Sequence, residues 1–137
     1  MRFIPTRVHG MLDYAMGALL IVAPWLFGFA EGGAETWIPV ILGVGALAYS
    51  LLTDYELGAV RAIPMRIHLM LDLASGALLA VSPWLLNFDE RVWMPHLILG
   101  LLEIGASLMT RTTPYEDRLT STATAPTAGI SADGGRH

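Results

Sequence analysis

The chain has 137 residues, which is enough for one ordinary domain. Hydrophobic residues make up 54% and charged residues only 15% of it, against about 25% charged residues in an average soluble domain. The formal net charge of −4 and the lack of lysine argue against a nucleic-acid-binding protein. The lack of cysteine excludes disulfides, thiolate metal sites and a cysteine nucleophile within this chain. These properties indicate a small integral membrane protein.

Four apolar segments follow one another along the chain, at residues 14–30, 37–53, 73–88 and 92–110. The first three contain no charged residue, and the fourth contains one carboxylate, Glu103. With its interfacial flanks, each segment approaches the roughly 20 residues that a membrane-spanning helix needs. A soluble amphipathic helix would show a polar stripe every three or four residues, and these segments show none. The sequence therefore predicts an all-α integral membrane protein with four transmembrane helices.

The two halves of the chain repeat each other. RFIPTRVH at residues 2–9 matches RAIPMRIH at residues 61–68, and the match continues to SLLT and SLMT, which end at Thr53 and Thr110. Each unit crosses the bilayer twice, so both units enter from the same side and a pseudo-two-fold axis lies along the membrane normal. We therefore predict two parallel hairpin repeats, at residues 1–56 and 57–112.

A tripeptide recurs in the first apolar segment of each repeat. Its two copies are Ala23-Pro24-Trp25 and Ser82-Pro83-Trp84. This pattern resembles the SPW-repeat family of small bacterial and archaeal membrane proteins, and the resemblance covers roughly residues 2–110. The first copy departs from the family tripeptide because Ala23 replaces the serine. The resemblance implies a multi-pass membrane protein and brings with it no reaction, substrate or catalytic residue.

The charged and aromatic residues indicate an orientation. Seven of the eight arginines lie in the N-terminal segment, the middle loop or the C-terminal segment, whereas Arg91 lies in another loop. The positive-inside rule then places both termini and the middle loop in the cytoplasm, with the chain in the plasma (inner) membrane. Tryptophans flank the two outer loops, as expected at a lipid–water interface. Residues 113–137, rich in Thr, Ala, Ser, Gly and Pro, predict a disordered cytoplasmic tail.

The prolines are expected to shape the helices. Pro24 and Pro83 each remove a backbone donor, so they should kink or end the first helix of each repeat. The Ser82 hydroxyl could satisfy a carbonyl freed in this way. Pro39 and Pro95 are predicted to lie in the first turn of the second helices, where the missing N–H has no consequence. From the small residues along the segments, we expect the first helices of the two repeats to pack directly on each other.

A polar pattern also recurs in both repeats. Arg7, His9 and Asp13 have the same spacing as Arg66, His68 and Asp72. Each histidine and aspartate are four residues apart and so share a helical face. A carboxylate near hydrocarbon needs a partner, and the pseudo-symmetry offers the histidine or the arginine of the other repeat.

Three interpretations of this pattern remain open. The groups could form a structural clasp between the two hairpins, or a proton or cation relay. Alternatively, His9 and His68 could ligate a haem iron or a divalent metal, with each aspartate orienting an imidazole.

Glu103 breaks the repeat, because its counterpart is Ala46. It lies about ten residues into the fourth segment, which places it near the middle of the bilayer. His96 lies seven residues earlier, on the same helical face. An intramembrane carboxylate suggests a function such as proton transfer. The alternative is a structural role, in which the Glu103 side chain is protonated and hydrogen-bonded to a neighbouring helix or across an oligomer contact.

The sequence shows no phosphate-binding loop, nucleophile elbow, HExxH or kinase pattern, so we expect no enzymatic activity. The leading prediction is a small inner-membrane protein of structural or accessory type, surrounded by lipid. One alternative is a proton- or cation-conducting unit that uses Glu103 and the His/Asp pairs. Another is a haem- or metal-binding electron-transfer subunit that uses His9 and His68. The sequence identifies no cofactor, and it leaves open a homo-oligomer or a membrane-protein partner.

Overall fold

The computed structural model describes residues 1–115, which form four α-helices. The helices are α1 (Thr6–Leu26), α2 (Ala34–Leu51), α3 (Met65–Leu85) and α4 (Met94–Met109). No strand forms among the described residues, so the prediction of an all-helical chain is confirmed. Helices α1, α2 and α3 are long and apolar enough to cross a membrane, whereas α4, with 16 residues, is shorter.

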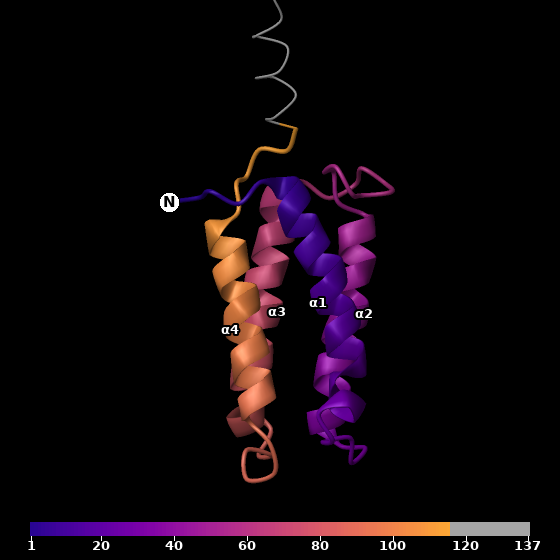
Figure 1. Ribbon diagram of the computed structural model, residues 1–137, viewed down its shortest axis with the longest axis vertical. Helices are drawn as coiled ribbons and strands as arrows, with labels where there is room; N and C mark the ends of the chain where they lie inside the picture. The colour runs from indigo at the N-terminus through magenta and orange to yellow at the C-terminus, as the bar shows by residue number, and fades with distance from the viewer. Residues whose placement is uncertain (116–137) are drawn as a thin grey trace, which may run out of the picture.

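The helices form two hairpins that stand side by side and begin at the same end of the bundle (Figure 1). Helix α1 packs along α2, and α3 packs along α4. The loops that join the helices within each hairpin lie together at one end of the bundle. The chain start and the middle loop lie together at the other end, as in a parallel repeat.

Two backbone pairs connect the hairpins across this second end. The Ile4 N–H donates to the carbonyl of Met109 at 3.0 Å, and the Ile63 N–H donates to the carbonyl of Leu52 at 2.8 Å. Ile4 and Ile63 are equivalent in the repeat, and so are Met109 and Leu52. The start of each repeat therefore pairs with the end of the other repeat, and the two hairpins close on each other.

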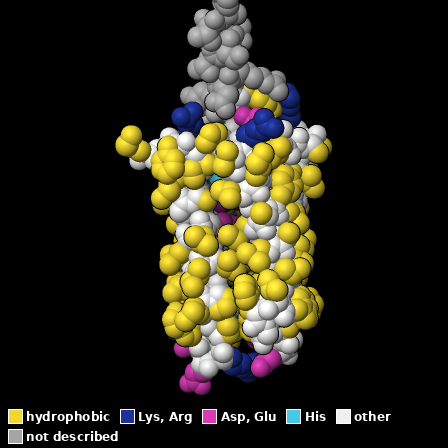
Figure 2. Space-filling model, viewed as in Figure 1, with side chains coloured by type: hydrophobic (Ala, Val, Ile, Leu, Met, Phe, Trp, Pro, Cys, Tyr) yellow, Lys and Arg dark blue, Asp and Glu magenta, His cyan; other side chains and the backbone are white. Residues whose placement is uncertain are grey.

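The outer surface of the bundle is apolar. Large hydrophobic side chains cover the face seen in Figure 2, while charged side chains gather at its two ends. The tryptophans near the inter-helix loops are also exposed, with Trp25 at 59% and Trp84 at 48%. Such a continuous apolar surface is a liability in water and a requirement in lipid.

The close helix contacts lie within each hairpin. A Cβ atom on Gly43 would lie 2.7 Å from the carbonyl oxygen of Gly17, and one on Gly100 would lie 2.5 Å from that of Gly76. The small residues of each first helix thus allow the second helix of the same repeat to approach closely. The expectation that α1 and α3 pack directly on each other is wrong, because these two helices make far fewer close approaches than either makes within its own hairpin.

The two tripeptide prolines lie near the ends of the first helices, which finish two residues later at Leu26 and Leu85. Because Pro83 has no N–H, it cannot bond the carbonyl of Leu79. The Ser82 hydroxyl donates to that carbonyl at 2.8 Å. The serine of the tripeptide therefore replaces the hydrogen bond that its own proline removes.

Pro39 differs from the prediction. Helix α2 begins at Ala34, so Pro39 lies inside the helix and not in its first turn. The carbonyl of Glu35 consequently has no helical donor, and it lies 3.0 Å from His96 Nε2, which donates to it. The helix starts early because the Glu35 carboxylate accepts the Gly33 N–H at 2.8 Å and holds the first turn. Pro95 lies in the first turn of α4.

The predicted tail lies outside the described residues from position 116 onward. Tyr115, the last described residue, contacts the middle loop. Its N–H donates to the Glu56 carboxylate at 2.8 Å, and its ring lies under the Arg61 guanidinium, 5.5 Å from centroid to carbon.

Candidate functional site

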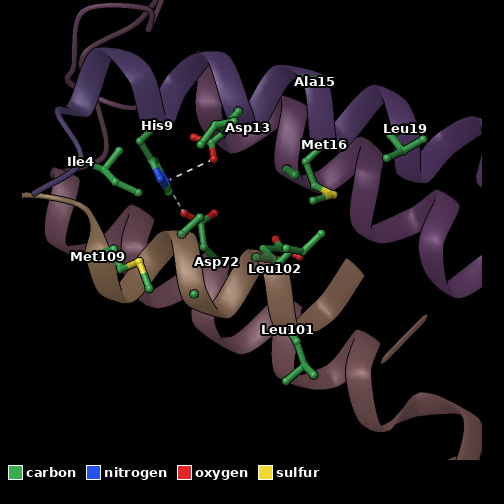
Figure 3. Close-up of a pocket in the computed structure, with 15 residues that line it drawn as sticks. Ile4, His9, Asp13, Ala15, Met16, Leu19, Asp72, Leu101, Leu102 and Met109 are labelled. Atoms are coloured by element: carbon green, nitrogen blue, oxygen red, sulfur yellow. Dashed lines mark hydrogen bonds and ion pairs between the residues drawn. The ribbon is translucent and has the colours of Figure 1, made fainter. Parts of the chain in front are cut away.

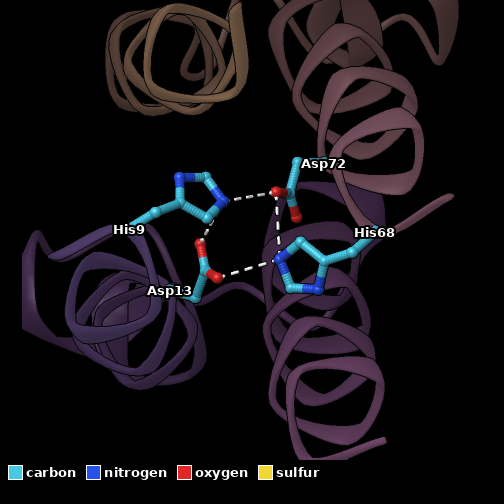
Figure 4. A group of neighbouring side chains, drawn as sticks. All are labelled: His9, Asp13, His68 and Asp72. Atoms are coloured by element: carbon cyan, nitrogen blue, oxygen red, sulfur yellow. Dashed lines mark hydrogen bonds and ion pairs between the residues drawn. The ribbon is translucent and has the colours of Figure 1, made fainter. Parts of the chain in front are cut away.

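Four ionisable side chains meet between α1 and α3, and we call them the His–Asp quartet (Figure 4). They are His9 and Asp13 from α1 and His68 and Asp72 from α3. His9 Nε2 lies 2.8 Å from Asp72 Oδ2, and His68 Nε2 lies 2.9 Å from Asp13 Oδ2. The single histidine–aspartate contact within each helix is 3.2 Å long. Each histidine therefore binds the aspartate of the other repeat more closely than its own.

The quartet is almost wholly buried. Its two histidines and Asp72 are at most 2% exposed, and Asp13 is 11% exposed. Arg7 and Arg66, the other candidate partners of the aspartates, lie on the exposed surface. Among residues 1–115, neither guanidinium forms an ion pair. The histidines, and not the arginines, are thus the partners of the two aspartates.

A threonine orients each histidine from the outer side of the quartet. Thr110 Oγ1 lies 2.8 Å from His9 Nδ1 and donates its hydroxyl proton to the Ala106 carbonyl at 2.6 Å. Thr53 Oγ1 lies 2.8 Å from His68 Nδ1 and donates to the Tyr49 carbonyl at 2.6 Å. A hydroxyl has one proton, so in both cases Nδ1–H must be the donor to the threonine oxygen. Nε2 of each ring therefore faces the carboxylates. It carries a lone pair when the imidazole is neutral and a second proton when the imidazole is charged.

Tyrosines complete one side of the quartet. The Tyr49 hydroxyl donates to Asp72 Oδ1 at 2.6 Å, and the ring of Tyr49 stands edge-on to His68. Tyr55, from the middle loop, is 1% exposed and packs over the same imidazole at 5.5 Å. Burial raises the pKa of the Tyr55 hydroxyl above its usual range, so this side chain stays neutral.

The middle loop is held over the quartet by α1. The Thr6 hydroxyl contacts both carboxylate oxygens of Glu56, at 2.9 and 2.7 Å, and the Tyr14 hydroxyl donates to the carbonyl of Leu57 at 2.9 Å. These contacts hold the loop that carries Tyr55 against α1.

Glu103 lies beside the quartet and is only partly satisfied. The Ser75 hydroxyl donates to Glu103 Oε1 at 2.6 Å. The other carboxylate oxygen, Oε2, is buried and has no hydrogen-bond partner among the described residues, and the residue is 8% exposed. A buried carboxylate with one free oxygen is a costly arrangement in a membrane protein.

A cavity of about 610 Å³ connects these groups with the surface between α1 and α4 (Figure 3). Its walls are apolar and include Met16, Leu19, Leu101 and Leu102. Its polar side chains are those of His9, Asp13, Asp72 and Glu103. In the space-filling view, acidic and histidine side chains are visible in a hollow of the apolar face (Figure 2). The cavity therefore joins a lipid-facing surface to the ionisable groups.

The cavity exists because the pseudo-symmetry is broken. On the α2–α3 side, Tyr49 fills the space next to Asp72. Its counterpart in the second repeat is Ala106, which lines the cavity on the α1–α4 side. Helices α2 and α3 accordingly approach each other more closely than α1 and α4 do. Replacement of a tyrosine by an alanine leaves one side of Asp13 open.

His96 does not join Glu103. It lies at the opposite end of the bundle, between Phe29 and Phe88, with ring centroids about 5 Å away. Its Nε2 donates to the Glu35 carbonyl that Pro39 leaves free. The tripeptide residues, including Trp25 and Trp84, likewise lie away from the quartet, at the far ends of α1 and α3. These residues therefore lie apart from the four ionisable side chains of the quartet.

Sequence reasoning did not identify Thr53, Thr110, Tyr49 or Ser75 as part of this region. One feature of the sequence did point to the threonines: Thr53 and Thr110 stand at equivalent positions at the ends of the two repeats, directly after the last apolar residues. Polar residues repeated at the ends of both second helices are explained by a shared contact. Tyr49 and Ser75 have no such signal, since their repeat counterparts are Ala106 and Met16.

The spacing of the four side chains limits the size of any group that the quartet can hold. The carboxylates of Asp13 and Asp72 occupy the space between the two imidazoles (Figure 4). A porphyrin held between His9 and His68 would need this space, so the geometry does not fit a haem. Protons or a single metal ion fit the distances between the four side chains.

The comparisons agree with the helical hairpin repeat. The chain matches the SPW repeat domain over residues 7–110, which is more than half of its length. No curated protein and no solved structure matches it. The chain belongs to the SPW repeat family.

Proposed function

We propose that this chain is a non-enzymatic membrane protein of structural or accessory type, in which the His–Asp quartet clasps the two repeats together. The observation that carries the proposal is the crossed pairing of His9 with Asp72 and of His68 with Asp13. The backbones of α1 and α3 make few close approaches. Between α1 and α3, the two hairpins are therefore joined by side chains.

The contacts of the quartet support a structural role. Both ring nitrogens of each histidine have partners, and Asp72 accepts from two histidines and from Tyr49. Buried polar groups that are fully paired rigidify a structure and specify one arrangement. In a bilayer, the alternative to this pairing is an unsatisfied group in hydrocarbon, which costs several kcal/mol by order of magnitude.

Thermal stability tests the clasp. Asp13→Asn and Asp72→Asn each keep the shape of the side chain and remove its charge. We expect each variant to lose about 1–3 kcal/mol of unfolding free energy in detergent, because a charged hydrogen bond is lost in a buried site. Asp89→Asn, in the loop between α3 and α4, is the matched control and should leave stability unchanged. Unchanged stability in both quartet variants would contradict a clasp.

We also propose that the chain lies in the plasma (inner) membrane with both termini in the cytoplasm. Support comes from the arginines, since Arg2, Arg7, Arg61 and Arg66 lie at one end of the bundle and Arg91 at the other. The chain has no cysteine, so single cysteines can be introduced at exposed positions without any background. In intact cells, a membrane-impermeant thiol reagent should label Glu31→Cys and Glu90→Cys but not Ala59→Cys. The reverse pattern would invert the orientation.

A second candidate function is the binding or conduction of a proton or cation. It is favoured by Glu103, which lines the cavity together with Asp13 and Asp72 and whose buried Oε2 has no hydrogen-bond partner among the described residues. Three carboxylates and two histidines leave this region with a surplus of acidic groups. Flux through liposomes that contain the purified chain, compared with Glu103→Gln, tests this function. Equal flux in the two proteins and in empty liposomes would contradict it.

A further inference from the structure

We infer that the His–Asp quartet is a tetrahedral binding site for one divalent zinc-like cation, which would bridge the two repeats. The inference goes beyond the proposed structural role, because a clasp held by protons alone would also join the hairpins. It starts from the four ligand atoms, His9 Nε2, His68 Nε2 and one oxygen each from Asp13 and Asp72, which all lie within 4.8 Å of one another.

The distances between these atoms suit a four-coordinate metal. Zinc bonds to histidine nitrogen and carboxylate oxygen are about 2.0–2.1 Å long, which sets the edges of the ligand tetrahedron at about 3.3 Å. In the quartet, Asp72 Oδ2 lies 2.8 and 3.2 Å from the two histidine nitrogens, whereas Asp13 contacts His68 with Oδ2 at 2.9 Å and His9 with Oδ1 at 3.2 Å. An ion at the centre lengthens these contacts by a few tenths of an ångström, and a small rotation of the Asp13 carboxylate then presents one of its oxygens.

The threonines fix the histidines in the form that binds a metal. Because Thr110 and Thr53 each give their proton to a helix carbonyl, they accept Nδ1–H from His9 and His68. The metal-binding lone pair of each neutral imidazole is then at Nε2, which faces the carboxylates. A hydrogen bond to the remote ring nitrogen is the usual outer-shell support of a histidine metal ligand.

Asp72 is also arranged as a single-oxygen ligand. Its Oδ1 accepts the Tyr49 hydroxyl at 2.6 Å, so Oδ2 is the oxygen that faces both histidines. A hydrogen-bonded second oxygen orients a ligating carboxylate. The two repeats thus supply the same pair of ligands, and a tyrosine directs one of them.

Charge balance favours a divalent ion. Nε2 and Oδ are both electron-rich, so contacts of 2.8–3.2 Å between them need a positive charge in between. Two protons supply it in the free protein, and one divalent cation can replace both. Two aspartates, two neutral histidines and one such cation sum to zero, which suits a site buried in a membrane. Two imidazoles with two carboxylates match zinc better than Ca²⁺ or Mg²⁺, which prefer six or more oxygens.

The cavity provides a route to the site. His9, Asp13 and Asp72 all line it, and it opens between α1 and α4 (Figure 3). Ile4 and Met109 also line it, and they belong to the end of the bundle where the chain starts. The cavity therefore exposes three of the four ligand residues without a separation of the helices.

Zinc binding by the full chain tests the inference. The chain is purified in detergent without a polyhistidine tag, stripped with a chelator and mixed with equimolar Zn²⁺, and bound metal is counted after desalting. We expect one ion per chain, and Co²⁺ in place of Zn²⁺ should give the visible absorption of four-coordinate cobalt. Wild-type protein that retains no zinc, or cobalt without this absorption, would overturn the inference and leave the clasp in place.

Variants assign the binding to the quartet. Asp72→Asn should weaken zinc binding by more than about 100-fold, and Thr53→Val, which keeps all four ligands, by about 10–100-fold. Thr53→Ser keeps the acceptor oxygen and should restore wild-type affinity. Asp89→Asn removes a carboxylate in the loop between α3 and α4, far from the quartet, and should bind zinc normally. Circular dichroism verifies that each variant is helical. Equal affinity in wild type, Asp72→Asn and Thr53→Val would overturn the inference, as would a loss in Asp89→Asn equal to that in Asp72→Asn.

Discussion

Tyr49 and Ala106 occupy equivalent positions in the two repeats, but only Tyr49 reaches an aspartate of the quartet, at 2.6 Å from Asp72. Ala106 leaves the corresponding space next to Asp13 empty and lines the cavity between α1 and α4. This difference helps to close one side of a nearly symmetric bundle and leaves the other side open.

Restoration of the symmetry should close the cavity. In Ala106→Tyr, the new ring has room within about 610 Å³, and its hydroxyl can reach Asp13 as Tyr49 reaches Asp72. Cavity filling commonly adds about 0.5–2 kcal/mol of stability, so we expect a higher Tm in detergent. Ala48→Tyr, on the exposed side of α2, is the control and should leave Tm unchanged. A lower Tm for Ala106→Tyr would show that the space is not available.

The serine of the tripeptide offers a test in both directions. Ser82 donates to the carbonyl that Pro83 leaves free, whereas Ala23 has no hydroxyl to give to the equivalent carbonyl. Ser82→Ala should therefore cost about 1 kcal/mol, and Ala23→Ser should gain a smaller amount. Unfolding of both variants in detergent, followed by circular dichroism, measures the two changes. A stabilising Ser82→Ala would refute the role of the hydroxyl.

We expect the role of His96 to be structural, through the hydrogen bond that it donates to the carbonyl of Glu35. His96→Leu removes the donor and should destabilise the chain by about 1–3 kcal/mol, since a buried carbonyl is left unpaired. Pro39→Ala restores an N–H to helix α2 and supplies a new donor to the same carbonyl. In the Pro39→Ala background, His96→Leu should therefore cost less. Additive effects of the two substitutions would argue against a shared carbonyl.

The sequence predicted most of the architecture. The repeat and the apolar segments gave the four helices and the parallel hairpins, since length and hydropathy largely determine a membrane helix. The helical spacing of His9 with Asp13 and of His68 with Asp72 made these four residues candidates for a shared cluster. The structure brings them together because each first helix starts at the same end of the bundle.

Other features required the three-dimensional arrangement. Glycine spacing shows that a helix can be approached closely, but it does not show by which helix, and Gly17 and Gly76 contact their own hairpins. The early start of α2 depends on the Glu35 carboxylate at its first turn, which changed the role of Pro39. Tyr49 contacts Asp72 across 23 positions of sequence, and no local pattern indicates this pair.

The crossed pairing of the two repeats is tested most directly by a double-mutant cycle between His9 and Asp72. Unfolding free energies are measured in detergent for wild type, His9→Gln, Asp72→Asn and the double variant, with His96→Gln in place of His9→Gln as the control cycle. A direct contact at 2.8 Å between buried groups predicts a coupling of about 1–3 kcal/mol for His9 with Asp72, and additivity in the control. Additive effects of His9→Gln and Asp72→Asn would contradict the crossed quartet.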